Sequence, residues 1–102
     1  MDDDALDSVF KALGDPLRRR ILDRLAKRPG QSLFEICAAS VAEDGSSLSR
    51  QTISQHLDML ERAGLVHTHW SGRTKLHTLD TAPLREAADA WLNNHLKKRT
   101  AK

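Results

Sequence analysis

The chain of 102 residues contains few of the residues on which several classes of protein depend. Its one cysteine excludes an intrachain disulfide and a metal site built from several thiolates. Aromatic residues make up only 4% of the chain, which argues against a stacking platform for single-stranded nucleic acid. No apolar run approaches the ~20 residues that span a bilayer, and the acidic start lacks the pattern of a signal peptide. We therefore expect a cytoplasmic protein without a membrane partner.

The length and net charge of the chain leave several functions open. A chain of this size holds one hydrophobic core, so we expect a single domain over residues 1–102. The formal net charge of +2 is too small to identify a nucleic-acid-binding protein by itself. The sequence contains no Ser-His-Asp order, glycine-rich phosphate loop or pair of carboxylates spaced for catalysis. We therefore do not expect an enzyme.

Apolar residues recur at helical spacing in five segments. The predicted helices cover residues 5–13, 16–28, 33–40, 50–63 and 82–96. Asp15 and Pro16 suit the cap and first residue of the second helix, and Ser32 with Glu35 has the spacing of a capping box. The polar residues 41–48 predict a loop before the fourth helix.

After the fourth helix the pattern changes from helix to strand. Residues 65–70 and 74–79 are rich in apolar, aromatic and β-branched residues, and they predict a β-hairpin with Ser71-Gly72 as its turn. The predicted fold class is therefore mainly α with a small β-hairpin, in the order α-α-α-α-β-β-α. This order is that of a winged helix-turn-helix. Its parts are the helix-turn-helix at residues 32–63 and the wing at residues 65–79.

The most informative segment is LSRQTISQHLDMLERAGLV, residues 48–66. Ser49 suits a helix N-cap, and Gly64 suits a left-handed helix end. The first two turns bring together side chains that can read base edges in the major groove of double-stranded DNA. These candidates are Arg50, Gln51, Thr52, Ser54 and Gln55. In isolation the segment also fits an amphipathic surface helix, but the hairpin with Arg73 and Lys75, which can reach a phosphate or the minor groove, favours DNA binding.

The first and last helices lie outside the helix-turn-helix and the wing. Each carries an apolar stripe with a large residue, and so small a domain can hardly cover both stripes. We therefore predict that residues 5–13 and 82–96 form a homodimer interface, since two-fold dimers match palindromic operators. The candidate interface residues are Leu6, Val9, Phe10, Leu84, Ala88 and Trp91. The alternative is that Trp91 closes the core of the single chain.

Three segments together carry a family resemblance: VFKALGDPLRRRIL (9–22), SRQTISQHLDMLERAGLV (49–66) and SGRTKLHTL (71–79). With them the chain resembles the ArsR/SmtB family of bacterial repressors. The resemblance implies a homodimeric winged helix-turn-helix that binds an operator and is released by an effector. By position it also implies DNA contacts at Gln51, Thr52, Ser54, Gln55 and His56, with Arg50 nearby and Arg73 on the wing.

The usual effectors of the family are metals, and here the chain departs from the family pattern. Ser32 and Phe34 occupy the positions of a Cys-x-Cys metal site, and neither is a thiolate. At a second site, which the family builds from Asp-x-His and a later His, Asp80 is present but Asn93 stands in place of the later histidine. The chain therefore resembles the metal-independent branch of the family. We predict no metal, no other cofactor and an unknown non-metal signal.

Two alternatives to a metal-free DNA-binding repressor remain open. The first is a metal- or redox-responsive sensor with unfamiliar ligands, either hairpin or interface histidines or Cys37. A two-residue turn at Ser71-Gly72 pairs Trp70 with Arg73 and places His67 and His69 on the face opposite His77, which disfavours a hairpin metal site. The second is a winged helix used only for binding other proteins.

Overall fold

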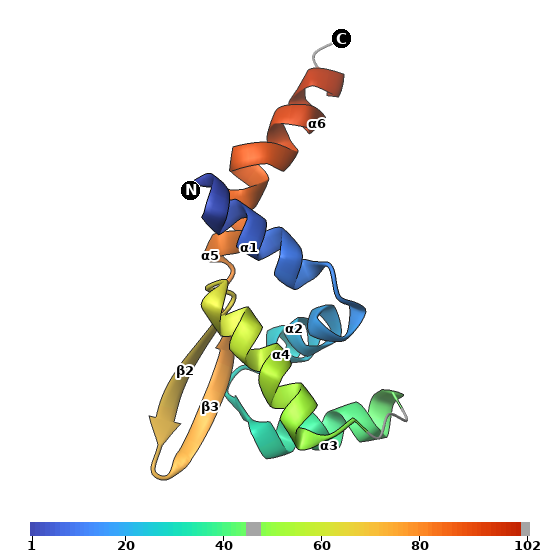
Figure 1. Ribbon diagram of the computed structural model, residues 1–102, viewed down its shortest axis with the longest axis vertical. Coiled ribbons are helices and arrows are strands. Elements are labelled where there is room, and N and C mark those ends of the chain that lie inside the picture. The colour runs from blue at the N-terminus through green and yellow to red at the C-terminus, as the bar shows by residue number, and fades with distance from the viewer. Residues whose placement is uncertain (45–47, 101–102) are drawn as a thin grey trace.

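The computed structural model describes residues 1–44 and 48–100. Four helices precede the hairpin: α1 (Asp3–Leu13), α2 (Pro16–Lys27), α3 (Leu33–Asp44) and α4 (Arg50–Arg62). The strands are β1 (Gln31–Ser32), β2 (Val66–Ser71) and β3 (Thr74–Leu79), and the helical segments α5 (Ala82–Ala87), η1 (Ala88–Leu92) and α6 (Asn93–Thr100) follow. The wing tip and the end of α6 lie at opposite ends of an elongated molecule of 51 × 29 × 22 Å (Figure 1). The predicted fold class, a mainly helical winged helix-turn-helix, is confirmed, although the sheet has three strands.

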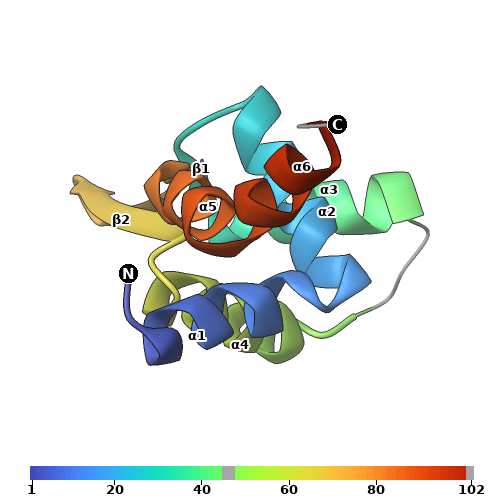
Figure 2. The same cartoon turned by 90° about the horizontal axis from the view of Figure 1, so that it is seen from above.

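The core forms where α2, α3 and α4 meet the base of the hairpin. Its largest fully buried side chains come from all of these elements: Ile21, Leu25, Ile36, Ile53, Leu60, Leu65 and Val66. Burial of each such side chain stabilises the fold by about 1.5–3 kcal/mol. Helix α1 packs against α2, α4 and α5, and the view from above shows it close to α4 and α5 (Figure 2).

The predicted helix starts are confirmed in α2 and α3. Asp15 Oδ1 accepts hydrogen bonds from the backbone N–H groups of Leu17 at 2.8 Å and Arg18 at 3.1 Å. Ser32 and Glu35 form a reciprocal capping box, in which each side chain accepts from the other residue's N–H at 3.1 and 3.0 Å. These bonds satisfy donors that the first turn of a helix leaves unpaired.

The wing turn lies one residue further along the chain than the sequence predicted. Ser71 pairs with Thr74 and Trp70 with Lys75, so the turn is Gly72-Arg73, and the predicted pairing of Trp70 with Arg73 is wrong. Gly72 has a φ of +63°, and no described residue other than glycine has a positive φ. Glycine therefore occupies the first central position of the turn, which a type II′ turn requires. His77 pairs with Thr68 and so still lies on the face opposite His67 and His69.

A third strand, β1, was not predicted. It has two residues, and it pairs antiparallel with β3 through Gln31 opposite His77 and Ser32 opposite Leu76. So short and polar a strand has no alternating pattern that identifies it. It places the wing beside the start of α3.

The α3 helix is longer than predicted and runs to Asp44, so residues 41–44 are helical rather than part of a loop. The cause is a tertiary contact. Arg24 Nε donates to Glu43 Oε2 at 2.9 Å, and Arg24 Nη1 donates to Ser40 Oγ at 3.0 Å. These bonds hold the second half of α3 against α2. The remainder of the predicted loop includes residues 45–47, which lie outside the described residues.

The last predicted helix, residues 82–96, is interrupted. A π-helical segment, η1, separates α5 from α6, whereas the sequence predicted one continuous helix. The segment carries Trp91, whose ring contacts Phe10 on α1. Such π-helical turns have a different periodicity from the α-helix, so a 3.6-residue pattern does not detect them.

Candidate nucleic-acid interface

Helix α4 begins where the sequence predicted. Ser49 is its N-cap: its Oγ accepts from the backbone N–H of Thr52 at 3.1 Å. Ile53, Leu57 and Leu60 are at most 3% exposed, so this side of α4 faces the core. The other side of the helix is presented outward, and α4 ends before Gly64, which has the predicted left-handed conformation with φ +79°.

Gln51 and Gln55 lie one turn apart on the outward side of α4, and both are exposed. Within residues 1–44 and 48–100 neither side chain takes part in a hydrogen bond. Each amide therefore keeps a donor and an acceptor for an external partner, the combination that reads an adenine edge. Arg50, in the first turn, is also exposed.

The remaining candidates of α4 are less exposed than the two glutamines. Thr52 is half-buried, and its Oγ1 lies 2.8 Å from Ser49 Oγ. Ser54 is half-buried on the side of α4 that faces the wing. His56 is half-buried with its Nδ1 3.3 Å from Arg18 Nη1. Arg18 also donates to the carbonyl oxygen of Ala12, near the end of α1, at 2.8 Å. Arg18 therefore lies between His56 and the end of α1.

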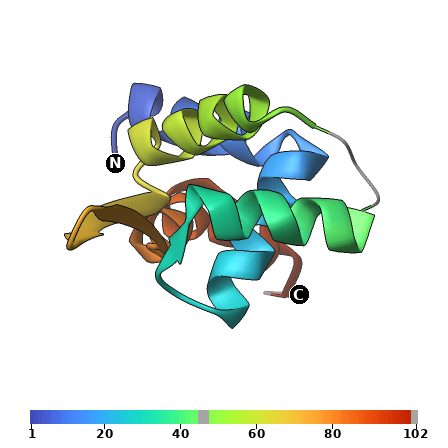
Figure 3. The ribbon, with the colours of Figure 1, turned by 90° about the horizontal axis from the view of Figure 1, so that it is seen from below.

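Figure 3, the view from below, shows α3 and α4 near each other, with the hairpin projecting to one side. Arg73 is exposed in the turn of this hairpin. Lys75 is half-buried on β3, directly opposite Trp70 on β2. The two predicted cations of the wing therefore differ: one is at the tip and the other on the side of the hairpin.

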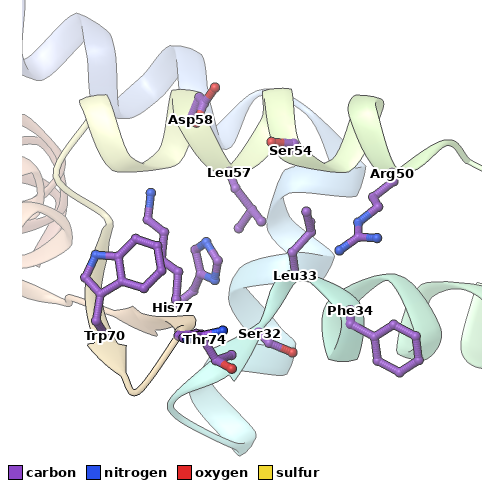
Figure 4. Close-up of a pocket in the computed structure, with 12 residues that line it drawn as sticks. Ser32, Leu33, Phe34, Arg50, Ser54, Leu57, Asp58, Trp70, Thr74 and His77 are labelled. Atoms are coloured by element: carbon purple, nitrogen blue, oxygen red, sulfur yellow. The ribbon is translucent and has the colours of Figure 1, made fainter.

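A cleft of about 530 Å³ separates α4 from the wing, and its third side is the junction of β1 and α3 (Figure 4). Four of its lining residues were predicted as DNA contacts: Arg50, Ser54, Arg73 and Lys75. The other eight lining residues were not predicted as DNA contacts, among them Ser32, Trp70, Thr74 and His77. Trp70 is 68% exposed, and an aromatic residue on a hairpin that also carries two cations was the signal that could have identified it.

Predicted interface residues gather where α1 meets η1. The rings of Phe10 and Trp91 pack edge to face with centroids 6.1 Å apart, and the ring of His95 lies 4.3 Å from that of Trp91. Trp91 nevertheless remains 48% exposed. Leu6, Phe10, Leu84 and Ala88 are half-buried.

Val9 does not lie on this surface. It is 1% exposed in the single chain because α1 packs against both α2 and α5. Helical spacing put Val9 on the same stripe as Phe10, but the structure assigns its side chain to the chain's own core, and its prediction as an interface residue is wrong.

The histidines and the cysteine do not converge. His67 Nε2 lies 2.5 Å from Asp80 Oδ2, and Asp80 Oδ1 accepts from the backbone N–H of Ala82 at 2.9 Å. This bond from Ala82, together with the His67 contact, holds the pKa of Asp80 below its usual value, although partial burial opposes the effect. Burial raises the pKa of the Cys37 thiol, against a smaller opposite effect of Arg50. Among the described residues, no three His, Cys, Asp or Glu side chains are placed to share a metal ion.

No helix in the described part of the chain is both long and apolar enough to cross a membrane.

Known proteins resemble this chain in sequence and in fold. A family model described as a helix-turn-helix domain matches residues 13–69. The HTH-type transcriptional regulator YuzN of Bacillus subtilis is 37% identical over 86 residues, covering 84% of this chain and 94% of that protein. The transcriptional repressor SdpR of the same organism is 33% identical over 93 residues, covering 91% of this chain and 94% of that protein. An ArsR-like transcriptional regulator from Rhodococcus sp. RHA1 superimposes with a TM-score of 0.71 at 31% identity, covering 95% of this chain and 87% of that structure.

Proposed function

This chain belongs to the ArsR-type helix-turn-helix transcriptional regulators, and from that membership we propose that it is a homodimeric repressor of transcription. It binds a palindromic operator in double-stranded DNA, inside the cytoplasm, and a signal other than a metal ion releases it. Repression is supported by the similarity to a relative named as a transcriptional repressor.

One observation carries the DNA-binding part of the proposal. The capped, exposed start of α4 presents Gln51 and Gln55 with amides that bond to no described residue of the chain. We assign these two side chains to base edges in the major groove. The surrounding DNA contacts in this proposal are Arg50, Thr52, Ser54, His56, Arg73 and Lys75.

The homodimer rests on the apolar surface at the opposite end. Trp91 is 48%, Leu92 41% and Leu96 58% exposed, although each is a large apolar residue. An exposed apolar patch of this kind marks an interaction surface in a small protein. With Leu6 and Phe10 it provides a self-complementary face for a two-fold dimer.

The proposal is tested by selecting genomic fragments that the purified protein binds and then measuring the affinity of variants for the selected operator. Gln55→Ala is expected to weaken operator binding by roughly 1–3 kcal/mol while leaving binding to unrelated duplexes unchanged, and Ser54→Ala to act in the same direction. Arg73→Ala is expected to weaken binding to all sequences alike. Arg62→Ala, which removes the same charge from the other end of α4, is the control.

Two outcomes contradict the proposal. If the protein shifts no duplex at low salt, the winged helix serves protein binding instead. If sedimentation shows a monomer at micromolar concentration, the dimer is excluded. In the same sedimentation experiment Trp91→Ala is expected to dissociate the dimer, whereas Trp70→Ala, which truncates the tryptophan at the other end of the molecule, is expected to leave it intact.

A further inference from the structure

The cleft between α4 and the wing is a surface that the two base-reading glutamines of α4, Gln51 and Gln55, do not line. Its walls are Arg50 and Ser54 on α4, and Trp70 and Lys75 on the hairpin. In Figure 4 the indole of Trp70 and the imidazole of His77 point from the sheet toward α4, whereas Asp58 points away from the cleft. A cleft of about 530 Å³ is large enough to hold a segment of another molecule.

The chemistry of the lining fits a phosphodiester chain. Arg50, Arg73 and Lys75 supply three cations, against Asp58 as the one acidic lining residue. Hydroxyl groups, which bind phosphate oxygens in protein–DNA complexes, come from two further lining residues, Ser32 and Thr74. The indole of Trp70 adds an N–H donor and an exposed apolar ring that can pack on a sugar.

The cleft is also held open by the fold. The backbone N–H of Gly30 donates to the carbonyl oxygen of His77 at 3.0 Å, and His77 Nδ1 donates to that of Gln31 at 2.9 Å. Gln31 Nε2 in turn donates to the carbonyl oxygens of Arg24 at 3.1 Å and Arg28 at 2.7 Å, at the end of α2. The base of the wing is therefore attached to the helical core, which sets the width of the cleft before a ligand enters.

We propose that this cleft binds the phosphodiester strand that separates the major groove occupied by α4 from the adjacent minor groove. The inference rests on the proposed function. If α4 occupies the major groove and the wing tip the neighbouring minor groove, the strand between the two grooves passes between these elements. Trp70 and Lys75 contact that strand: Lys75 forms an ion pair with a phosphate, and the ring of Trp70 packs on the neighbouring deoxyribose.

The fluorescence of Trp70 can show whether this residue contacts DNA. In the wild-type protein, tryptophan fluorescence is measured with acrylamide as quencher, without and with a 24-base-pair duplex of arbitrary sequence at low salt, and the signal of Trp91 is subtracted with the help of Trp70→Phe. Binding is followed separately by the anisotropy of the labelled duplex. We expect the bound duplex to lower the quenching constant of Trp70 several-fold. The matched variant Trp70→Phe, which retains Trp91, is expected to show no such protection.

A second measurement locates the phosphate. Lys75→Gln is expected to reduce the slope of log affinity against log salt by about one. Duplexes with a single neutral methylphosphonate are then scanned along one strand. At one position, neutralisation of the phosphate is expected to weaken DNA binding by the wild-type protein about as much as Lys75→Gln does. The same neutral phosphate is expected to weaken DNA binding by the Lys75→Gln variant little further.

The outcomes separate the two proposals. Bound duplex that leaves Trp70 as accessible to acrylamide as before, or a salt slope unaltered by Lys75→Gln, overturns the strand-binding cleft while the DNA-binding function stands. Failure of the wild-type protein to bind any duplex overturns both.

Discussion

The Nδ1 atom of His77 lies 2.9 Å from the carbonyl oxygen of Gln31, and this hydrogen bond joins two residues 46 positions apart. Because a carbonyl oxygen only accepts, Nδ1 carries the proton and donates. The side chain is 6% exposed, so the bond lies in the interior between β3 and β1. It is one of the bonds that attach the wing to the helical core.

We predict that His77→Leu lowers the free energy of unfolding by about 1–3 kcal/mol. The leucine leaves the buried carbonyl oxygen of Gln31 without this donor, and a buried polar group that loses its partner retains the cost of its desolvation. Urea denaturation monitored by circular dichroism measures the change. His69→Leu is the matched control: His69 is exposed on β2, and its substitution is expected to change stability by less than about 0.5 kcal/mol. Equal losses in both variants contradict the role given to His77.

Asp15 gives a pH-dependent contribution to stability. Partial burial acts to raise the pKa of its carboxyl group, but hydrogen bonds from the backbone N–H groups of Arg18 and Leu17 and the Arg18 charge lower it on balance. A pKa that is lower in the folded state means that the stabilisation is present above the unfolded value of 3.8 and is lost as pH falls through the folded value.

We therefore expect Asp15→Ala to lose about 1 kcal/mol of stability at pH 7, the usual value of an N-cap, and to lose less below pH ~4. Urea denaturation at a series of pH values from 7 to 3 measures this. Asp15→Asn keeps an acceptor for the helix start without the charge. Its loss of stability is expected to be smaller than that of Asp15→Ala and to vary little with pH. A deficit of Asp15→Ala that stays constant down to pH 3 excludes a contribution from the carboxylate.

Features of the fold that depend on neighbouring residues were predictable. The limits of α4 follow from the Ser49 cap, the apolar stripe and Gly64, all within one segment. The wing register was wrong by one residue because both Ser71-Gly72 and Gly72-Arg73 place glycine in a two-residue turn. Only the strand pairing decides between them.

Features that depend on distant residues were not predictable from local patterns. The extension of α3 depends on the contact of Glu43 with Arg24, 19 residues earlier. The cleft is formed by three separate segments, so Ser32 and Trp70 share a surface that no single motif describes. For the same reason the exposed glutamines of α4 could be identified as candidates, whereas the neighbours of Trp70 could not.

Cys37 is expected to react slowly. Burial raises the pKa of its thiol, and Arg50 opposes this only in part. Since the thiolate is the reactive form, the folded protein at pH 7 should react with 5,5′-dithiobis(2-nitrobenzoate) several-fold more slowly than the same protein in urea. Absorbance at 412 nm follows the reaction. A folded protein that reacts as fast as the unfolded one contradicts this expectation and supports a redox-responsive thiol.

The Ser49 cap links the stability of α4 to DNA binding, and two substitutions separate these effects. Ser49→Ala removes the acceptor for the Thr52 N–H, and we expect it to lower the free energy of unfolding by about 1 kcal/mol. Ser49→Asp restores an equally good cap and should recover this stability. Its carboxylate, however, lies at the end of α4 that is proposed to face phosphates, so it should weaken binding to every duplex, most strongly at low salt.

Urea denaturation and fluorescence anisotropy with a labelled duplex, carried out on both variants, measure the two effects. The expected result is a crossed pattern: Ser49→Ala is the less stable protein, and Ser49→Asp is the weaker DNA binder. If Ser49→Asp binds DNA as tightly as the wild-type protein across the salt range, the start of α4 does not approach the phosphates, and the proposed orientation of the helix on DNA is wrong.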